Sequence, residues 1–406
     1  MSFDFSSVLR DDLPAPAVRF NGFPKYNFVG GHNDAENVPV DDLTAAATAV
    51  LKREGASLAT YGLNSGSQGY IALRRFVAAK LKGRAQIDCT PDDILVVSGS
   101  LQALDLVNAV LLKPGDTVVV EESSYGGALT RLRAIGVNYV GVKLDGEGMR
   151  MDHLAEVLED LKSRGVRAKY IYTIPTVQNP TGSVLPVERR KELLRLSAEY
   201  DVPVFEDDCY ADLLWGAERP PAIRALDTEE RVIYCGSFSK SIAPALRVGY
   251  LVAPWAVLSR MIAAKTDGGT GALEQMVLAE YCAAQFDPHV ASLTDVLHGK
   301  CEAIAEALAA QFGTAAEFTP PKGGIFIWVK LPDSVDTSRL AQAAIQEGVA
   351  LNPGAEWSAD AEAGSHKLRL CFGHPTVEVI REGVAKLADI CHREFGVPVR
   401  SANVER

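Results

Sequence analysis

The feature that most constrains this chain is a series of short apolar segments that alternate with helix-like segments through its middle. The apolar run "ILVV" (94–97) precedes "LQALDLVNAVLL" (101–112), whose apolar residues recur at helical spacing, and "TVVVE" (117–121) follows. Similarly, "VERRKELLRLSAEY" (187–200) separates the apolar runs "YIYTIP" and "VPVFED". Apolar strands without polar alternation are buried on both faces. The sequence therefore predicts an α/β fold with a mostly parallel sheet and helices on both faces.

The chain is also predicted to have more than one domain. Its 406 residues exceed what a single core usually holds. After about Pro288 the pattern changes to an Ala-rich helix, the strand "GGIFIWVKL", a helix, the short strand "LRLCF" and a last helix. We therefore expect a large domain over 46–287 and a smaller α+β domain over 288–406. The segment 1–45, rich in Pro, Gly and Asn, is expected to be irregular and to pack with the small domain and over the active site.

Composition excludes several classes of protein. The formal net charge of -11 argues against a nucleic-acid partner, which requires a basic surface. The seven cysteines are scattered without a C-x-x-C pair, so we expect buried thiols in a reducing compartment and no disulfide framework or metal site. The N-terminus shows no secretory signal, and no apolar run is long enough to span a bilayer. These features predict a cytoplasmic protein with no membrane partner.

Polar residues follow several of the predicted strands, at the sheet edge where ligands of such sheets bind. Ser100 and the backbone N–H of Leu101 open the helix after "ILVV" and are suited to an anion. In "CGSFSKSIAPALRVGY", two serines and an arginine are suited to a phosphate, namely Ser237, Ser239 and Arg247. Taken alone, a strand–Gly–Ser–helix junction is more often only a tight turn.

Five further strand-end residues match one cofactor. Tyr125 can stack on a planar ring, and Asp207 can neutralise a ring nitrogen. Asn179 and Tyr210 can bind a phenolate oxygen, and Lys240 can form an imine. Each has a simpler explanation: a packed tyrosine, an Asn-Pro turn, a surface acidic pair or one more phosphate ligand. Together with the phosphate donors they describe a site for pyridoxal 5'-phosphate.

The motifs "QNPTG", "EDDCY", "GSFSKSIAPALRVGY", "PKGGIFIWVKL" and "LRLCF" occur in the order seen in one known family. On these motifs the chain resembles a fold type I pyridoxal-phosphate enzyme of the class I/II aminotransferases, within the 2-aminoadipate and kynurenine aminotransferase branch. The resemblance covers nearly the whole chain and implies a seven-stranded large-domain sheet. It makes Lys240 the imine lysine, Arg247 the phosphate arginine and Asp207 the ring-nitrogen acid.

The resemblance also implies substrate and subunit contacts. Arg369 matches the arginine that binds the substrate α-carboxylate, for which a guanidinium is well shaped. Gly31 lies in the segment that closes over the substrate. Tyr61 matches a tyrosine that reaches the phosphate of the neighbouring subunit, which implies a homodimer with shared active sites. Without the family, "KLRLCF" reads as a strand with one outward arginine.

Three features depart from the family or remain unassigned. Cys209 stands where relatives commonly have proline, between the acids and Tyr210. The loop 266–273, "TDGGTGAL", is unusually rich in glycine and is expected near the active-site mouth. Arg10 and Arg19 are candidates for a distal acid group of a substrate, although charged residues in such segments are usually only solvated.

The implied reaction moves an amino group from an L-amino acid to a 2-oxo acid in a ping-pong cycle between PLP and its amine form. The catalytic residues would be Lys240, Asp207 and Tyr125. The alternatives are β-elimination or decarboxylation on the same cofactor and, more remotely, an effector-sensing regulator domain, for which no basic recognition helix is found. A nicotinamide-dependent dehydrogenase is disfavoured because no G-x-G-x-x-G follows a strand.

Overall fold

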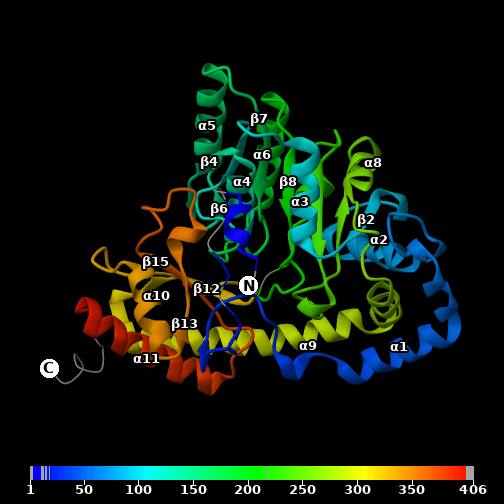
Figure 1. The fold of residues 1–406 in the computed structure, drawn as a ribbon. Helices are drawn as coiled ribbons and strands as arrows, with labels where there is room; N and C mark the ends of the chain where they lie inside the picture. Colours follow the sequence, from blue (N-terminus) through cyan, green and yellow to red (C-terminus); the bar gives the residue numbers. More distant parts are fainter. Residues whose placement is uncertain (1–2, 11–12, 14–15, 18, 217, 399–406) are drawn as a thin grey trace.

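The computed structural model describes residues 3–10, 13, 16–17, 19–216 and 218–398, and its largest element is a seven-stranded sheet (Figure 1). In spatial order the strands are β2 (Ile94–Val97), β10 (Gly249–Val252), β9 (Val232–Ser237), β8 (Val204–Asp207), β7 (Ala168–Thr173), β3 (Thr117–Glu121) and β4 (Asn138–Val142). Only β10 runs antiparallel to its neighbours, and the remaining pairs are parallel. The predicted mostly parallel sheet is confirmed.

Helices cover both faces of this sheet because its strands are apolar on both sides (Figure 1). In β2, Leu95 and Val97 pack in the cluster that contains α3, α4 and α8, whereas Ile94 and Val96 pack in the cluster that contains α2 and the start of α9. Helices α5 and α6 pack over β3, β7, β8 and β9 in a further cluster. The bounds are α2 Ile71–Ala85, α3 Ser100–Leu111, α4 Gly126–Ile135, α5 Met151–Ser163, α6 Val187–Glu199, α7 Ile223–Leu226 and α8 Trp255–Ala264.

A second, smaller sheet follows in the C-terminal part of the chain. Its four strands are antiparallel, in the order β11 (Glu317–Phe318), β12 (Phe326–Lys330), β15 (Lys367–Cys371) and β14 (Asn352–Pro353). Helices α10 (Thr337–Gln346) and α11 (Val377–Phe395) pack on it around a core of its own. The α+β character predicted for this part of the chain is therefore seen.

Helix α9 (Ala272–Phe312) connects the two parts as one continuous element of 41 residues. Its first half packs in the core of the large sheet, and its second half packs in the core of the small one. Pro288 lies inside the helix, where it removes one backbone donor, so packing at both ends must outweigh that loss. The boundary predicted between 287 and 288 falls within this helix, and the division into domains remains a proposal.

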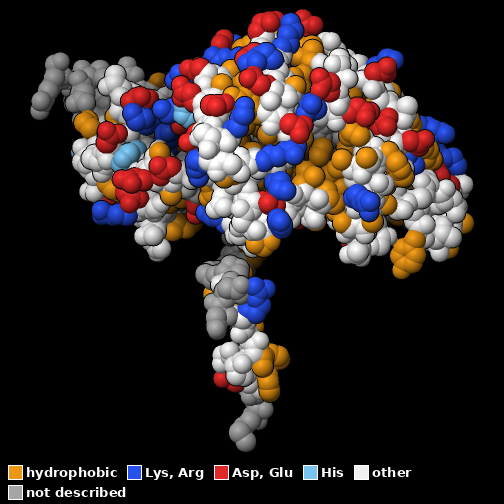
Figure 2. Space-filling model, turned by 90° about the horizontal axis from the view of Figure 1, so that it is seen from above, with side chains coloured by type: hydrophobic (Ala, Val, Ile, Leu, Met, Phe, Trp, Pro, Cys, Tyr) orange, Lys and Arg blue, Asp and Glu red, His pale blue; other side chains and the backbone are white. Residues whose placement is uncertain are grey.

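The N-terminal segment joins the small sheet and the site before α1 (Val40–Glu54) begins. Strand β1 (Tyr26–Asn27) pairs in parallel with β13 (Val349–Ala350). Asn33 Nδ2 then donates to the carbonyl oxygens of Lys240 and Ile242, at 3.2 Å each. The described residues from 3 to 22 are exposed, and Figure 2 shows this part of the chain projecting from the body of the molecule.

Two smaller features complete the fold. A hairpin of β5 (Leu144–Asp145) and β6 (Gly148–Met149) precedes α5. All seven cysteines are free thiols, and every one except Cys89 is buried. Within the described ranges, none of the helices combines the length and the apolar character that crossing a membrane requires.

Candidate active site

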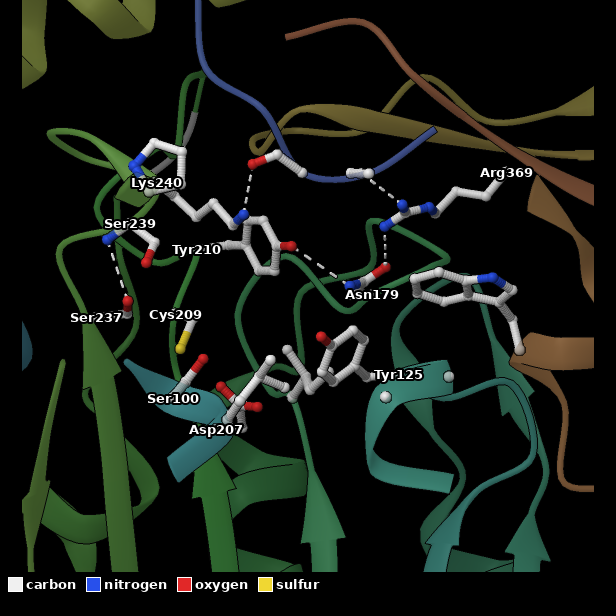
Figure 3. Close-up of a pocket in the computed structure, with 18 of the residues that line it drawn as sticks. Ser100, Tyr125, Asn179, Asp207, Cys209, Tyr210, Ser237, Ser239, Lys240 and Arg369 are labelled. Atoms are coloured by element: carbon white, nitrogen blue, oxygen red, sulfur yellow. Dashed lines mark hydrogen bonds between the residues drawn. The ribbon is translucent and has the colours of Figure 1, made fainter. Parts of the chain in front are cut away.

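A cavity of about 740 Å³ lies at the carboxyl ends of the central strands, between the two sheets. Its walls include every residue predicted for the site except Tyr61. These residues are Gly31, Ser100, Leu101, Tyr125, Asn179, Asp207, Tyr210, Ser237, Ser239, Lys240, Arg247 and Arg369. Figure 3 shows that the labelled side chains converge on one space from several different strands and loops. Residues more than 300 positions apart in the sequence, such as Gly31 and Arg369, therefore share one site.

Hydroxyl and backbone donors gather at one end of the cavity. Ser100 begins α3, so the N–H groups of Ser100 and Leu101 have no partner within the helix and are directed at the cavity end. Ser237 ends β9, and its Oγ accepts the N–H of Ser239 at 3.1 Å. A helix N-terminus beside two serine hydroxyls is an arrangement suited to a phosphate.

Arg247 adds a positive charge to this end. Its backbone is left-handed (φ 53°), and its Nη2 donates to the carbonyl oxygen of Ser98 at 3.0 Å. Gly99 adopts a positive φ of 84°, and a Cβ at this position would overlap the Arg247 guanidinium. The glycine therefore allows the guanidinium to lie against the turn that begins α3.

Asp207 supplies a buried carboxylate on the floor of the cavity. It is the last residue of β8 and is 5% exposed, and its Oδ2 accepts the hydroxyl hydrogen of Tyr172 at 2.8 Å. Burial raises the pKa of Asp207 above its ordinary value, and hydrogen bonds from Cys209 and then Tyr172 oppose that rise. A buried carboxylate is costly unless a cation meets it, so this position favours a positively charged ligand atom. Tyr125, at the start of α4, lines the same cavity.

Lys240 reaches across the cavity mouth to the N-terminal segment. Its Nζ donates to the carbonyl oxygen of Gly31 at 2.6 Å. Figure 3 marks a hydrogen bond at the end of the Lys240 side chain with a dashed line. A Cβ at Gly31 would collide with that Nζ, so a side chain at this position would force the Lys240 amine to shift. Burial lowers the pKa of Lys240 to about 8. About a tenth of this amine is therefore neutral at pH 7, far more than for an ordinary lysine, and the neutral form is what a nucleophile or general base requires.

Arg369 lies on the opposite side of the cavity, on β15. Its Nη1 donates to Asn179 Oδ1 at 3.2 Å, and its Nη2 donates to the carbonyl oxygen of Gly30 at 2.6 Å and to Asn352 Oδ1 at 3.0 Å. Its guanidinium lies 3.9 Å from the ring centre of Trp357. The Nε atom is buried and has no partner among the described residues. A buried guanidinium with an unused donor is suited to a ligand carboxylate.

Asn179 and Tyr210 join the two sides of the cavity. Asn179 Nδ2 donates to the hydroxyl oxygen of Tyr210 at 3.4 Å while its Oδ1 accepts from Arg369. Both side chains are buried, and burial raises the pKa of Tyr210 well above its ordinary value. Tyr210 therefore remains a hydroxyl donor that can be directed at a ligand oxygen.

Several residues at the site were not predicted from the sequence. Trp357 lies in a short 3-10 helix and does not follow a predicted strand. Tyr172 lies within a strand, where the sequence indicates only a buried apolar position. Glu121 ends β3 and is fully buried, where it accepts from Thr173 Oγ1 at 2.7 Å and from Gln178 Nε2 at 2.9 Å. Glu121 could have been predicted from the sequence, because an acid at the end of an apolar strand requires a partner.

Tyr61 lies outside this cavity. Its side chain is 94% exposed and lines a separate cavity of about 930 Å³ together with residues of the predicted loop 266–273. In that loop, Thr270 Oγ1 lies 3.3 Å from Ser98 Oγ, close to the Arg247 contact. Arg10 and Arg19 are exposed and do not line the main cavity. The single chain therefore does not bring Tyr61 or these arginines to the site.

The residues present fit pyridoxal phosphate. Hydroxyl, backbone and guanidinium donors match a phosphate, and the buried carboxylate of Asp207 matches a protonated ring nitrogen. Lys240, with its lowered pKa, matches the amine that must bond to an aldehyde. The Nε of Arg369 has no hydrogen-bond partner among the described residues, so the guanidinium that lines the cavity keeps a donor for a further anionic group.

Comparison with known proteins gives a consistent result. The family model for "Aminotransferase class I and II" matches residues 31–387. The aromatic-amino-acid aminotransferase 1 of Thermococcus litoralis is 34% identical over 91% of this chain and 88% of its own length. The 2-aminoadipate transaminase of Thermus thermophilus is 36% identical over 89% and 88%. The crystal structure of a Pyrococcus horikoshii kynurenine aminotransferase in complex with PMP superimposes with a TM-score of 0.86, at 34% identity over 92% of each chain.

Proposed function

The chain belongs to the class I and II aminotransferases and is a pyridoxal-phosphate-dependent enzyme of amino acids and 2-oxo acids, and we propose that the cavity residues divide its chemistry as described below. Bound pyridoxal phosphate supplies the aldehyde that takes up the amino group and the ring that accepts electrons from the substrate Cα. The chain's own residues bind, orient and transfer protons around that group.

Ser100, Ser237, Ser239 and Arg247 are proposed to hold the phosphate, together with the N–H of Leu101. Asp207 would hold a proton on the ring nitrogen, which it can do because its buried carboxylate has no cation of its own within the described chain. Tyr125 would lie on the ring face, and Asn179 and Tyr210 would bind the ring oxygen.

Lys240 is proposed to carry the proton transfer. Its Nζ would hold the aldehyde group of the cofactor, and as a free amine it would take the proton from the substrate Cα and deliver it to the cofactor C4′. The 2.6 Å contact with the Gly31 carbonyl shows that Nζ reaches the side of the cavity opposite its own strand end. The lowered pKa supports a base that is partly neutral at physiological pH.

Arg369 is proposed to bind the substrate α-carboxylate, and its unused buried Nε is the observation that carries the proposed function. A carboxylate that bonds to Nε and one Nη places the substrate between Trp357 and Lys240. The aromatic wall favours donors with a large planar or long side chain. The relatives named for aromatic amino acids, 2-aminoadipate and kynurenine support the same class.

A panel of L-amino acids, mixed one at a time with the purified holoenzyme, tests this function. We expect aromatic and long-chain donors to convert the cofactor absorbance to that of the amine form, with one equivalent of 2-oxo acid released. Arg369→Lys should raise KM for every donor because a lysine cannot bind a carboxylate through two parallel bonds. Release of ammonia or carbon dioxide in place of a 2-oxo acid would instead indicate the β-elimination or decarboxylation alternative.

We also propose that the enzyme is a homodimer with shared sites, in the cytoplasm. The 94% exposure of Tyr61, beside a separate cavity whose lining includes several glycines, supports a surface that a second chain covers. The free state of all seven cysteines supports a reducing compartment. The division into segments 1–45, 46–287 and 288–406 is retained as a proposal, with α9 spanning its second boundary.

A further inference from the structure

Three potential metal ligands meet beneath the cavity. The Asp207 carboxylate, the Cys209 thiol and the Cys235 thiol place one ligand atom each within 4.8 Å of one another. Cys209 is 9% exposed and lines the cavity, whereas Cys235 is fully buried behind it. Figure 3 shows Cys209 beside Asp207 on the cavity floor. The cluster is therefore reachable from the cavity and shielded on its other side.

Sheet geometry explains why these residues meet. Asp207 in β8 is the direct partner of Cys235 in β9, and both strands run parallel, so the two side chains lie on the same face. Cys209 lies in the turn two residues after Asp207, and its thiol lies within 4.8 Å of the other two ligand atoms. The arrangement depends on Cys209, which lies between the two acids that end β8 and Tyr210.

The three groups form a donor set that thiophilic divalent ions prefer. Zinc binds thiolates at about 2.3 Å and carboxylate oxygens at about 2.0–2.2 Å, with catalytic and accessible sites using three protein ligands and one open position. Two sulfurs on one tetrahedral ion lie about 3.8 Å apart. All three ligand atoms lie within 4.8 Å of one another, so that they can converge on one ion.

We propose that Asp207, Cys209 and Cys235 bind one thiophilic divalent cation, of the Zn²⁺ or Cd²⁺ type, in the cofactor-free protein, and that this ion and pyridoxal phosphate exclude each other. Binding forms two metal–sulfur bonds and one metal–oxygen bond and releases the two thiol protons to solvent. The resulting site carries one net negative charge, which the nearby Lys240 can offset. Mutual exclusion rests on the proposed role of Asp207 as the ring-nitrogen partner.

Cd²⁺ alone is a suitable probe, because cadmium thiolates absorb in the ultraviolet. The full chain, stripped of pyridoxal phosphate, is titrated with Cd²⁺ and the bound ion counted by equilibrium dialysis. We expect one tight ion per chain and a thiolate–cadmium absorbance. Cys209→Ser and Cys235→Ser should each weaken binding by about 100-fold or more, since losing even an outer-shell partner costs about 10–100-fold. Cys282→Ser, a buried thiol in α9 outside the cluster, is the matched control and should bind as the parent does.

The outcomes separate the two parts of the proposal. Equal Cd²⁺ affinity in all three variants, with circular dichroism showing that they are folded, would overturn the site. If Cys235→Ser is unfolded, Cys235→Ala and the Cys209→Ser variant, whose position lines the cavity, provide the same comparison. Reloading with pyridoxal phosphate should release the ion. Retention of Cd²⁺ by the fully loaded protein would leave the metal site standing and overturn mutual exclusion, while donor turnover in metal-free buffer tests the aminotransferase function independently.

Discussion

At the scale of single residues, Lys240 makes the most direct prediction. Reduction of the holoenzyme with borohydride followed by peptide mapping should place the cofactor on Lys240. Lys240→Ala should keep pyridoxal phosphate bound through the phosphate and ring contacts but abolish turnover. A label on Lys265, which pairs with Asp267 instead, or on Lys322 would contradict the assignment.

The same amine predicts a pH dependence. Its pKa is lowered by burial to about 8 from an ordinary value of 10.5, and only the neutral form attacks an aldehyde. The rate of cofactor attachment to the stripped protein should therefore rise as pH increases through about 8 and level off above it. Stopped-flow absorbance over a pH series measures this rate, and a midpoint near 10 would show that Lys240 is not desolvated.

Asp207 is predicted to control the ring nitrogen. Asp207→Asn should raise the activation free energy by about 4 kcal/mol, or about a thousandfold in rate, because a neutral amide cannot hold the ring proton. The neighbouring Asp208 pairs with Arg219 at 2.6 Å, so Asp208→Asn should lower the melting temperature while affecting turnover per folded molecule far less. Turnover near that of the parent in Asp207→Asn would assign the ring contact to another group.

At the scale of elements, the end of β3 supports the loop that carries Asn179. Glu121 accepts from Thr173 and Gln178, and Gln178 Oε1 in turn accepts the N–H of Thr181 at 2.8 Å. Gln178 Nε2 also donates to the carbonyl oxygen of Ser123 at 2.7 Å. The buried carboxylate thus fixes both ends of the segment from Ile174 to Thr181 before any ligand binds.

Burial raises the pKa of Glu121 from 4.5 to about 7, which gives this element a pH-dependent stability. Between these values the folded state keeps a proton that the unfolded state has lost, so stability falls as pH rises from about 4.5 to about 7. Glu121→Gln should reduce the fall in the free energy of unfolding over this pH range by an amount on the order of 3 kcal/mol. Urea unfolding at a series of pH values across this range measures the free energy of unfolding, with Glu122→Gln as the control. If that free energy depends on pH equally steeply in Glu121→Gln and in the parent protein, the prediction is wrong.

At the scale of the whole molecule, a shared site predicts complementation between two inactive chains. If Tyr61 serves the neighbouring subunit, co-expression of Lys240→Ala with Tyr61→Ala gives mixed dimers with one doubly damaged site and one intact site. Activity should then exceed that of either parent variant. If mass spectrometry shows that mixed dimers form but activity does not rise, Tyr61 belongs to its own chain's site. The shared arrangement would then be refuted.

The sequence predicted the large sheet and most of the cavity because both depend on local patterns. Apolar runs such as 94–97 specify buried strands, and polar residues directly after them lie at one edge of a parallel sheet. Trp357 and Asn352 have no such signal, since they reach the cavity only when the small sheet packs against the large one. The continuity of α9 through Pro288 was likewise not predictable from propensity, which places a break there.

By itself, therefore, the sequence determined the strand-and-helix order, the cofactor class and the residues at strand ends, because each depends on short contiguous segments. Only the tertiary structure decided which distant segments meet. It placed the Gly31 carbonyl on Lys240, aligned Arg369 with Asn179, and brought Cys209 to Cys235 through the pairing of β8 with β9. These contacts depend on how sheets and loops pack against each other, and packing of residues far apart in the chain leaves no spacing pattern in the sequence.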